Sequence, residues 1–152
     1  MNYDAVNPKL LDLAQSVTET LIQNLKKLCE IENEYSRWTK EEKEALGIKE
    51  YFQQYVNEYK QIIDEIGTEK LKNSRYGGSI SHPAEYHYLF EEYRGICVMK
   101  STKKVTVEFY YQYGNKSKHQ FTLKLEQDEY KLDGVKYGFW DSSDEVWHKT
   151  NV

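Results

Sequence analysis

The sequence has few of the residues from which disulfide frameworks and metal centres are built. Its 152 residues include two cysteines and four histidines. Cys29 and Cys97 stand far apart in apolar contexts, and there is no CxxC motif and no Cys/His cluster. We therefore expect two buried free thiols in a reducing compartment rather than a disulfide or a ligand pair.

Catalytic and cofactor motifs are also lacking. The chain contains no HExxH motif, no histidine or cysteine pairs at zinc spacing, no Gly-rich phosphate loop and no GxSxG motif. Each of these patterns fixes ligands or a nucleophile at a spacing that its chemistry requires. We therefore predict no metal, no cofactor and no catalytic residue, and expect a protein that is not an enzyme.

Long apolar runs and an excess of positive charge are missing as well. No stretch approaches the roughly 18 apolar residues of a membrane span, and the N-terminus lacks the basic and apolar regions of a signal peptide. The net charge is -4, with basic residues scattered among acids. Neither a membrane nor nucleic acid is therefore expected as partner, and a cytoplasmic location is predicted.

What the chain does have, in its first half, is helical periodicity. Asn7-Pro8 provides a cap and a first-turn proline, and leucines recur at helical spacing over 8–34. Thr39-Lys-Glu-Glu42 is a capping box that opens a short helix ending at Gly47. A third helix is predicted over 48–66 with Tyr51, Tyr55 and Tyr59 on its apolar side, and 68–73 adds one further turn.

The second half shows the period of two that is typical of strands. Apolar and polar residues alternate over 105–113 and over 120–126, and a third strand is predicted over 130–140. A loop is expected at 114–118. The change of period falls near Gly77-Gly78, which we interpret as the hinge between a helical and a sheet half.

These patterns predict one α+β domain, 1–152. Its helical half, 7–74, covers one face of a strongly curved antiparallel sheet that is built mostly from 93–140 within a sheet half at 86–149. The odd-numbered strand residues from Val105 to Tyr113 are expected to face the helices. The even-numbered residues are expected to face outward, where such a face is ordinarily solvated: Glu108, Tyr110, Gln112, Thr122, Lys124, Glu126, Lys136 and Trp140.

The chain also resembles a known fold family. The segments that carry the resemblance are the helical half and, after it, 76–86, 96–109, 121–133 and 136–139. Together they look like a nuclear transport factor 2-like fold, and more narrowly like the immunity proteins of that fold in bacterial polymorphic toxin systems, including those of Rhs type. The family often has Gly-Lys-Trp or Gly-Glu-Trp where this chain has Asp128-Glu129-Tyr130.

This resemblance implies a cystatin-like cone and a protein that neutralises a cognate toxin by binding it. Tyrosine occurs 14 times, and although most tyrosines suit a core, aromatic residues that face outward are typical of interfaces. Acidic residues beside them would suit a basic toxin. The predicted partner-binding residues are Glu108, Tyr110, Trp140, Asp141, Asp144 and Glu145, and Trp147 lies in the same acidic segment.

Two other classes of function stay open at this point. The first is an enzyme or small-ligand binder that uses the cone pocket, with an inward Asp and Tyr or with His82, Glu85 and His87 as an acid–base group. His119 and His148 are expected at the surface. The second is a structural module that forms a homodimer through the open face of its sheet.

Overall fold

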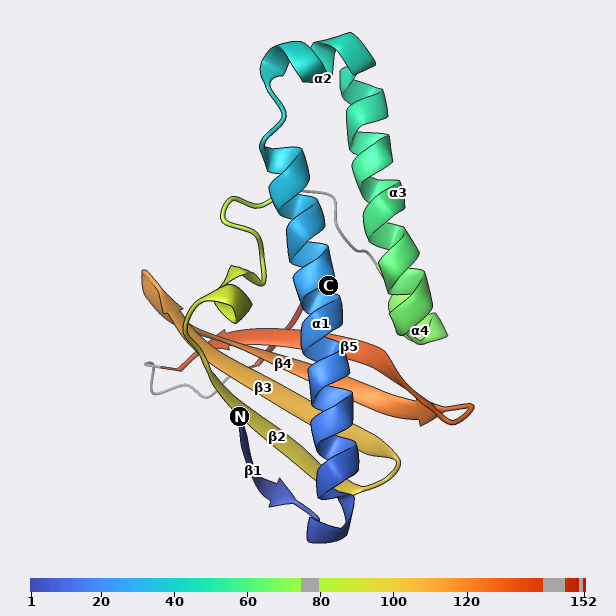
Figure 1. The fold of residues 1–152 in the computed structure, drawn as a ribbon, viewed down its shortest axis with the longest axis vertical. Coiled ribbons are helices and arrows are strands. Elements are labelled where there is room, and N and C mark those ends of the chain that lie inside the picture. The colour runs from blue at the N-terminus through green and yellow to red at the C-terminus, as the bar shows by residue number, and fades with distance from the viewer. Residues whose placement is uncertain (75–79, 141–146, 151) are drawn as a thin grey trace.

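The structure, a computed structural model, describes residues 1–74, 80–140, 147–150 and 152, so the expected hinge at Gly77-Gly78 lies outside the described residues. A short strand precedes the helices, and the other strands follow them, which confirms the α+β class (Figure 1). The helices are η1 (Pro8–Leu10), α1 (Leu11–Ser36), α2 (Lys40–Leu46), α3 (Ile48–Ile66), α4 (Glu69–Lys72) and η2 (His87–Phe90). The strands are β1 (Asn2–Val6), β2 (Arg94–Ser101), β3 (Lys104–Tyr113), β4 (Asn115–Glu126), β5 (Glu129–Phe139) and β6 (His148–Thr150).

The predicted helix boundaries follow from local signals that the structure preserves. The side chain of Asn7 accepts a hydrogen bond from the Lys9 amide at the start of η1. Thr39 and Glu42 form both hydrogen bonds of the capping box that begins α2. Gly47, with φ of 101°, separates α2 from α3. A left-handed backbone of this kind is strained for any residue with a Cβ, so glycine is needed at this corner.

The six strands form one open sheet in the order β1-β2-β3-β4-β5-β6. The neighbours from β2 to β6 pair antiparallel, as expected, but β1 pairs parallel with β2. The prediction of an entirely antiparallel sheet is therefore wrong at this edge, where Asn2 lies opposite Ile96. Five residues of mixed polarity gave no periodic signal for a strand.

The turns differ from expectation in one place. The predicted loop at 114–118 is mostly strand, because Gly114, with φ of 70°, reverses the chain and β4 begins at Asn115. Gln127 and Asp128, with φ of 49° and 66°, form a two-residue turn between β4 and β5. Positive φ at both central residues matches the twist of a tight hairpin. The pairing also shifts by one residue at Asp133, which forms a β-bulge.

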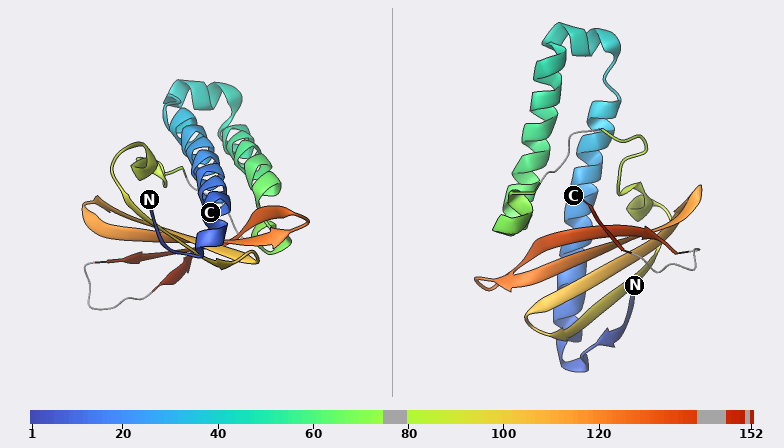
Figure 2. Two further views of the ribbon diagram at one scale, coloured as in Figure 1. Left: turned by 60° about the horizontal axis from the view of Figure 1, so that its bottom comes forward. Right: turned by 180° about the vertical axis from the view of Figure 1, so that it is seen from behind.

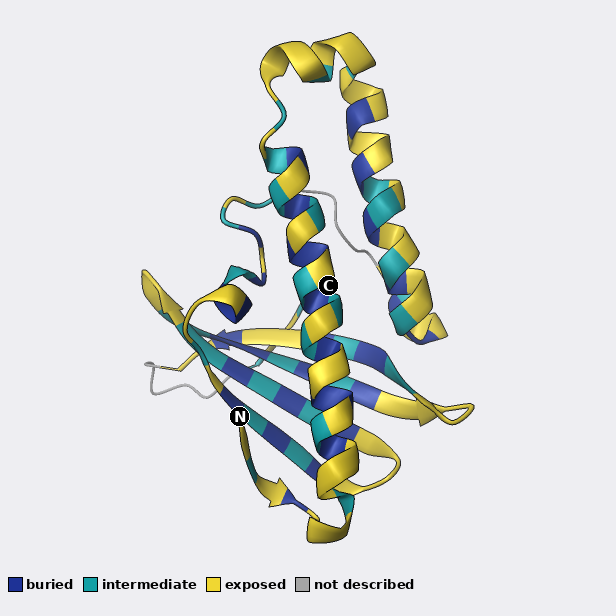
Figure 3. Ribbon diagram, in the orientation of Figure 1, coloured by how far each residue is buried: buried dark blue, intermediate teal, exposed yellow. Residues whose placement is uncertain are grey.

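Helices α1 and α3 lie on one side of the sheet, and no helix of the described residues lies on the other side (Figure 2). The odd-numbered residues of β3 from Val105 to Phe109 are buried against the helices, so the predicted inward face is confirmed for them. Alternation of buried and more exposed residues is visible along the strands (Figure 3). Tyr113 is an exception, since it is 60% exposed at the strand end.

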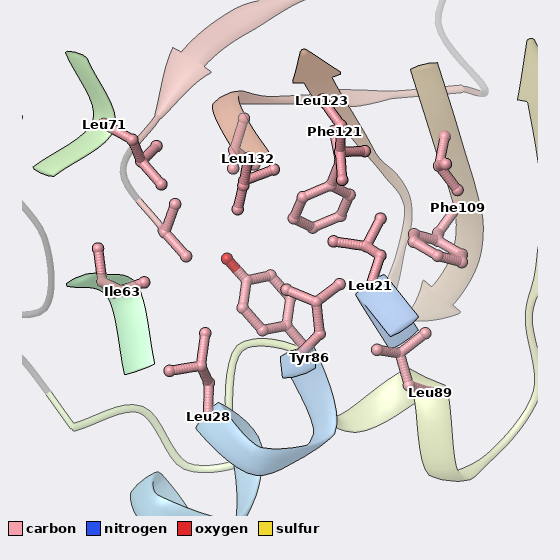
Figure 4. Close-up of a cluster of buried hydrophobic side chains, with 14 of the residues drawn as sticks. Leu21, Leu28, Ile63, Leu71, Tyr86, Leu89, Phe109, Phe121, Leu123 and Leu132 are labelled. Carbon is pink, nitrogen blue, oxygen red and sulfur yellow. The ribbon is translucent and has the colours of Figure 1, made fainter. Parts of the chain in front are cut away.

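Two layers of core hold the molecule together. Between α1 and the sheet, apolar side chains such as Leu21, Phe109, Phe121 and Leu132 pack around Tyr86 (Figure 4). Both cysteines are buried and free, so the prediction of two buried free thiols is confirmed. None of the described helices is long and apolar enough to cross a membrane.

The second layer joins α1 to α3, which extend together beyond the sheet and are connected by α2 (Figure 1). The ring of Tyr35 lies 5.5 Å from that of Tyr51 and 5.4 Å from that of Tyr55, measured between centroids. The hydroxyl of Tyr51 donates to the Tyr35 carbonyl at 2.6 Å. Tyr51, Tyr55 and Tyr59 are all buried, so their predicted core role is confirmed.

Candidate interaction surface

The outer face of the sheet, which points away from α1 and α3, holds the predicted binding residues that the structure describes. Glu108 and Tyr110 project from β3, and Trp140 follows β5. Their places follow from strand parity, because alternate residues of a strand point to opposite faces. The register then sets their neighbours: Arg94 lies opposite Tyr110, and Gln120 lies opposite Glu108.

Glu108 is engaged by its neighbours on this face. The Tyr110 hydroxyl donates to one oxygen of the Glu108 carboxylate, and the Gln120 side-chain amide donates to the other at 3.1 Å. Both Glu108 and Tyr110 are half-buried. The predicted acidic residue is therefore part of a hydrogen-bonded group that fixes the Tyr110 ring, and it is not a freely presented charge.

Cations lie over the aromatic rings beside this group. The Arg94 guanidinium is 5.0 Å from the centroid of the Tyr110 ring and 5.7 Å from that of Trp140. The Lys116 ammonium lies 4.9 Å from the Trp140 ring. Trp140 is held by its indole N–H, which donates to the Tyr111 carbonyl at 3.2 Å. We call Arg94, Tyr110, Lys116 and Trp140 the cation–aromatic cluster.

The cluster borders a hollow of about 350 Å³ that is lined by residues of β2, β3 and the segment before β2, together with Trp140. Trp140 is 37% exposed, which is high for a large aromatic side chain. Trp147 extends the same surface, because the Lys118 ammonium lies 4.1 Å from its ring centroid. Asp141, Asp144 and Glu145 lie outside the described residues.

On the described residues the outer face carries more basic than acidic side chains, whereas the predicted acidic residues Asp141, Asp144 and Glu145 lie outside the described residues. Strand parity and register gather cations that are far apart in the sequence, and they outnumber the carboxylates at outward positions, which are Glu108, Glu126, Glu129 and Asp133. The basic residues include Arg94, Lys104, Lys116, Lys118, Lys124, Lys136 and Lys149. Sequence reasoning missed this basic face, although all seven residues follow the outward parity of their strands.

A second hollow, of about 460 Å³, lies on this face next to α4. Its lining includes Lys104, Lys124, Lys136 and Lys149. Asp133 is its carboxylate, and accepts from Thr68 at 2.9 Å and pairs with Lys124 at 3.1 Å. Although burial by itself raises the pKa of Asp133, the hydrogen bonds from Thr68 and Lys124 and the charges of Lys124 and Lys70 lower it overall.

Of the four histidines, His119 differs from the sequence prediction. His119 was expected at the surface but is only 2% exposed. Its Nε2 lies 3.3 Å from the Glu85 carboxylate, and its Nδ1 lies 2.9 Å from the Tyr88 hydroxyl. The hydrogen bond with His119 is the largest cause of the lowered pKa of Glu85. His119 thus ties the segment around η2 to β4.

His82 and His87 do not form a pair with Glu85 of the kind that acid–base chemistry requires. His82 is exposed. The Nδ1 of His87 lies 2.9 Å from the Ala84 carbonyl oxygen, and its ring packs 4.9 Å from that of Tyr113. His148 is exposed on β6, as expected.

A buried carboxylate lies on the helical side of the molecule. Glu32 of α1 is 3% exposed and accepts hydrogen bonds from the backbone amides of Ser81, at 3.0 Å, and Glu85, at 3.5 Å. Burial raises its pKa to about 7, although these two hydrogen bonds oppose the shift. The carboxylate thus accepts hydrogen bonds from two backbone amides of the segment that leads into η2, in place of backbone carbonyl groups.

An apolar cavity of about 200 Å³ lies between α1, the end of α3 and strands β4 and β5. Tyr130 contributes to its lining, and its hydroxyl donates to the Thr102 carbonyl at 2.6 Å. The described lining contains no carboxylate and no histidine. Its residues are Leu13, Ser16, Val17, Thr20, Leu21, Asn24, Ile66, Leu123, Tyr130 and Leu132.

Within the described ranges, no group of three His, Cys, Asp or Glu side chains is arranged to hold a metal ion. Comparison with known proteins assigns no family. No family model, no curated protein and no solved structure matches the chain. The outer face of the sheet is therefore the candidate site on its geometry alone.

Proposed function

We propose that this chain is an immunity protein that binds and neutralises a cognate bacterial toxin in the cytoplasm, without catalysis. The resemblance to immunity proteins of the nuclear transport factor 2-like fold motivates the proposal. The α+β architecture, with helices on one side of a sheet, is compatible with that fold. The finer assignment to a cystatin-like cone is part of the proposal.

The observation that carries the proposal is the cation–aromatic cluster on an outer face that no described helix covers. Tryptophan, tyrosine and arginine are the residue types that most often dominate binding energy in protein interfaces. Here Arg94 lies over the rings of both Tyr110 and Trp140 beside a hollow. Their positions are fixed by hydrogen bonds to Glu108 and to the Tyr111 carbonyl, so little side-chain entropy is lost on binding.

The test begins with the gene next to the one that encodes this chain. Its product, or its C-terminal domain, is expressed under an inducible promoter with and without this protein, and growth and co-purification are measured. We expect growth arrest without the protein, and rescue together with a stable complex when it is present. Normal growth in both cultures, or rescue without a complex, would contradict the proposal.

Trp140→Ala should weaken the complex by about 2 kcal/mol or more, or roughly 30-fold in Kd, because Trp140 is the expected anchor. Phe52→Ala is the matched control, since Phe52 is an exposed aromatic residue of α3, 44% accessible, on the helical side. Circular dichroism establishes that both variants are folded. Equal affinities for the two variants would move the interface away from the outer face.

The apolar cavity beside α1 supports a second candidate, a small-ligand binder. Its volume of about 200 Å³ suits a small apolar molecule. Leu21→Trp should fill the cavity. If that variant loses protection against the toxin while Trp140→Ala retains it, small-ligand binding becomes the better proposal.

A further inference from the structure

We infer that the partner presents a cluster of carboxylates to the outer face, so that the bound surface is an acidic protein segment. The inference rests on the proposed function, because it names the chemistry of the partner at the same face. It reverses the expectation from sequence, in which acidic residues of this chain would meet a basic toxin. The charges of the described residues indicate that the partner surface is acidic.

The cations of the cluster are held in place but are not neutralised there. No carboxylate of the described residues lies within 4 Å of Arg94, Lys116 or Lys118. A ring beneath a guanidinium occupies its flat face and leaves the N–H groups in its plane free to donate. These donors match a carboxylate in a bidentate arrangement. Arg94, placed over Tyr110 and Trp140, is thus preorganised to bind one.

The second hollow repeats this charge pattern on the same face. Asp133 pairs with Lys70 at 3.5 Å and with Lys124 at 3.1 Å. Lys136 and Lys149, which lie opposite each other on β5 and β6, have no such partner among the described residues. Arg94 at the first hollow and Lys136 and Lys149 at the second are separate cations on one face, and they fit a partner with several acidic groups better than they fit a single small anion.

The same contacts favour an acidic protein over single-stranded nucleic acid. Proteins that bind single strands combine a basic groove with aromatic rings on which bases stack. Here Tyr110, Trp140 and Trp147 each already carry a cation over the ring. Stacked bases would compete with these cations for the ring faces, whereas carboxylates would bind to the cations in place.

The test uses two triple variants with the same change of net charge. In the face variant, Lys116→Glu, Lys136→Glu and Lys149→Glu reverse the outer-face charge. In the helix variant, Lys27→Glu, Lys49→Glu and Lys60→Glu reverse exposed lysines of α1 and α3. Binding is measured for the product of the neighbouring gene, a 15-residue polyglutamate peptide and a 15-nucleotide oligo-dT, each at 50 and 300 mM NaCl.

We expect the native protein to bind polyglutamate more tightly than oligo-dT, and more weakly at 300 mM than at 50 mM NaCl. The face variant should lose at least tenfold in affinity for polyglutamate and for the toxin, while the helix variant stays within twofold of the native protein. Equal effects of the two variants would overturn the inference. Tighter binding of oligo-dT, abolished in the face variant, would replace the acidic protein with nucleic acid.

The two proposals fail in different ways. If the toxin binds the native protein and both variants equally, the immunity function stands and the acidic-partner inference is wrong. If the product of the neighbouring gene does not bind but polyglutamate binds through the face, the chemistry of the surface stands and the identity of the partner is wrong.

Discussion

At the scale of single residues, the buried polar groups determine how the molecule responds to pH. Glu32 is the clearest case, because its pKa in the folded protein, about 7, lies above the ordinary glutamate value of 4.5. The folded state therefore binds a proton more tightly than the unfolded state. The resulting stabilisation is fully present below pH 4.5 and is lost as the pH rises to about 7.

Glu32→Gln should therefore flatten the pH dependence of stability between pH 5 and 7. In the native protein, the raised pKa of Glu32 corresponds to a loss of at most about 3 kcal/mol in the free energy of unfolding over this window. Urea unfolding at pH 5, 6, 7 and 8 measures it, with Glu30→Gln, an exposed site on the same helix, as control. A variant whose stability falls with pH as steeply as that of the native protein would contradict the assignment.

Two neighbouring tyrosines give a matched pair of predictions. Among the described residues, the buried hydroxyl of Tyr86 has no hydrogen-bond partner, and it points into the apolar cluster (Figure 4). The hydroxyl of Tyr88 is bonded to His119. Tyr86→Phe should stabilise the protein by about 1 kcal/mol, and Tyr88→Phe should destabilise it by about 1 kcal/mol. Denaturant unfolding of both variants checks this, and the same sign of change for both would contradict it.

His119 shows what residue-level prediction from the sequence misses. It occupies an inward position of β4, in phase with Phe121 and Leu123. The same parity that correctly predicted these apolar neighbours also predicts that His119 is buried. The sequence predicted a loop at 114–118, which placed His119 at the start of a strand. A histidine next to a loop is ordinarily exposed, so its inward position was not recognised. That Gly114 alone forms the turn between β3 and β4 could not be inferred from composition.

At the scale of elements, the sequence predicted helices better than it predicted sheet edges. Capping residues and apolar periodicity fix α1, α2 and α3 locally, so their limits agree closely with the structure. Strand β1 is paired only to a segment about 95 residues later in the chain. Such a strand depends on tertiary contacts, and its own five residues contain no pattern that predicts it.

The helical hairpin of α1 and α3 should depend strongly on its aromatic contacts, since much of it extends beyond the sheet. Tyr51→Ala should destabilise the protein by about 3 to 5 kcal/mol, as other large-to-small core changes do. Tyr51→Phe should cost only about 1 kcal/mol, because it removes only the bond to the Tyr35 carbonyl. Trp38, whose ring lies 5.2 Å from that of Tyr51, is a local fluorescence reporter. Similar losses for both variants would contradict this account.

At the scale of the whole molecule, charge is segregated in a way that net charge conceals. The chain carries -4 overall, yet basic residues outnumber carboxylates on the outer face of the described residues. The outward placement of Tyr110 and Trp140 could be predicted from strand parity. The basic face could not, because it depends on which strands are neighbours and on the shift of register at Asp133.

The central claim is that the partner binds the outer face of the sheet, and crosslinking from defined positions tests it most directly. A photoreactive phenylalanine analogue is placed at Tyr110 in one variant and at Phe52 in a second, and each is irradiated in the presence of the product of the neighbouring gene. We predict a crosslinked complex from position 110, with sites at acidic segments of the partner, and none from position 52. Crosslinking from position 52 but not from position 110 would contradict the account.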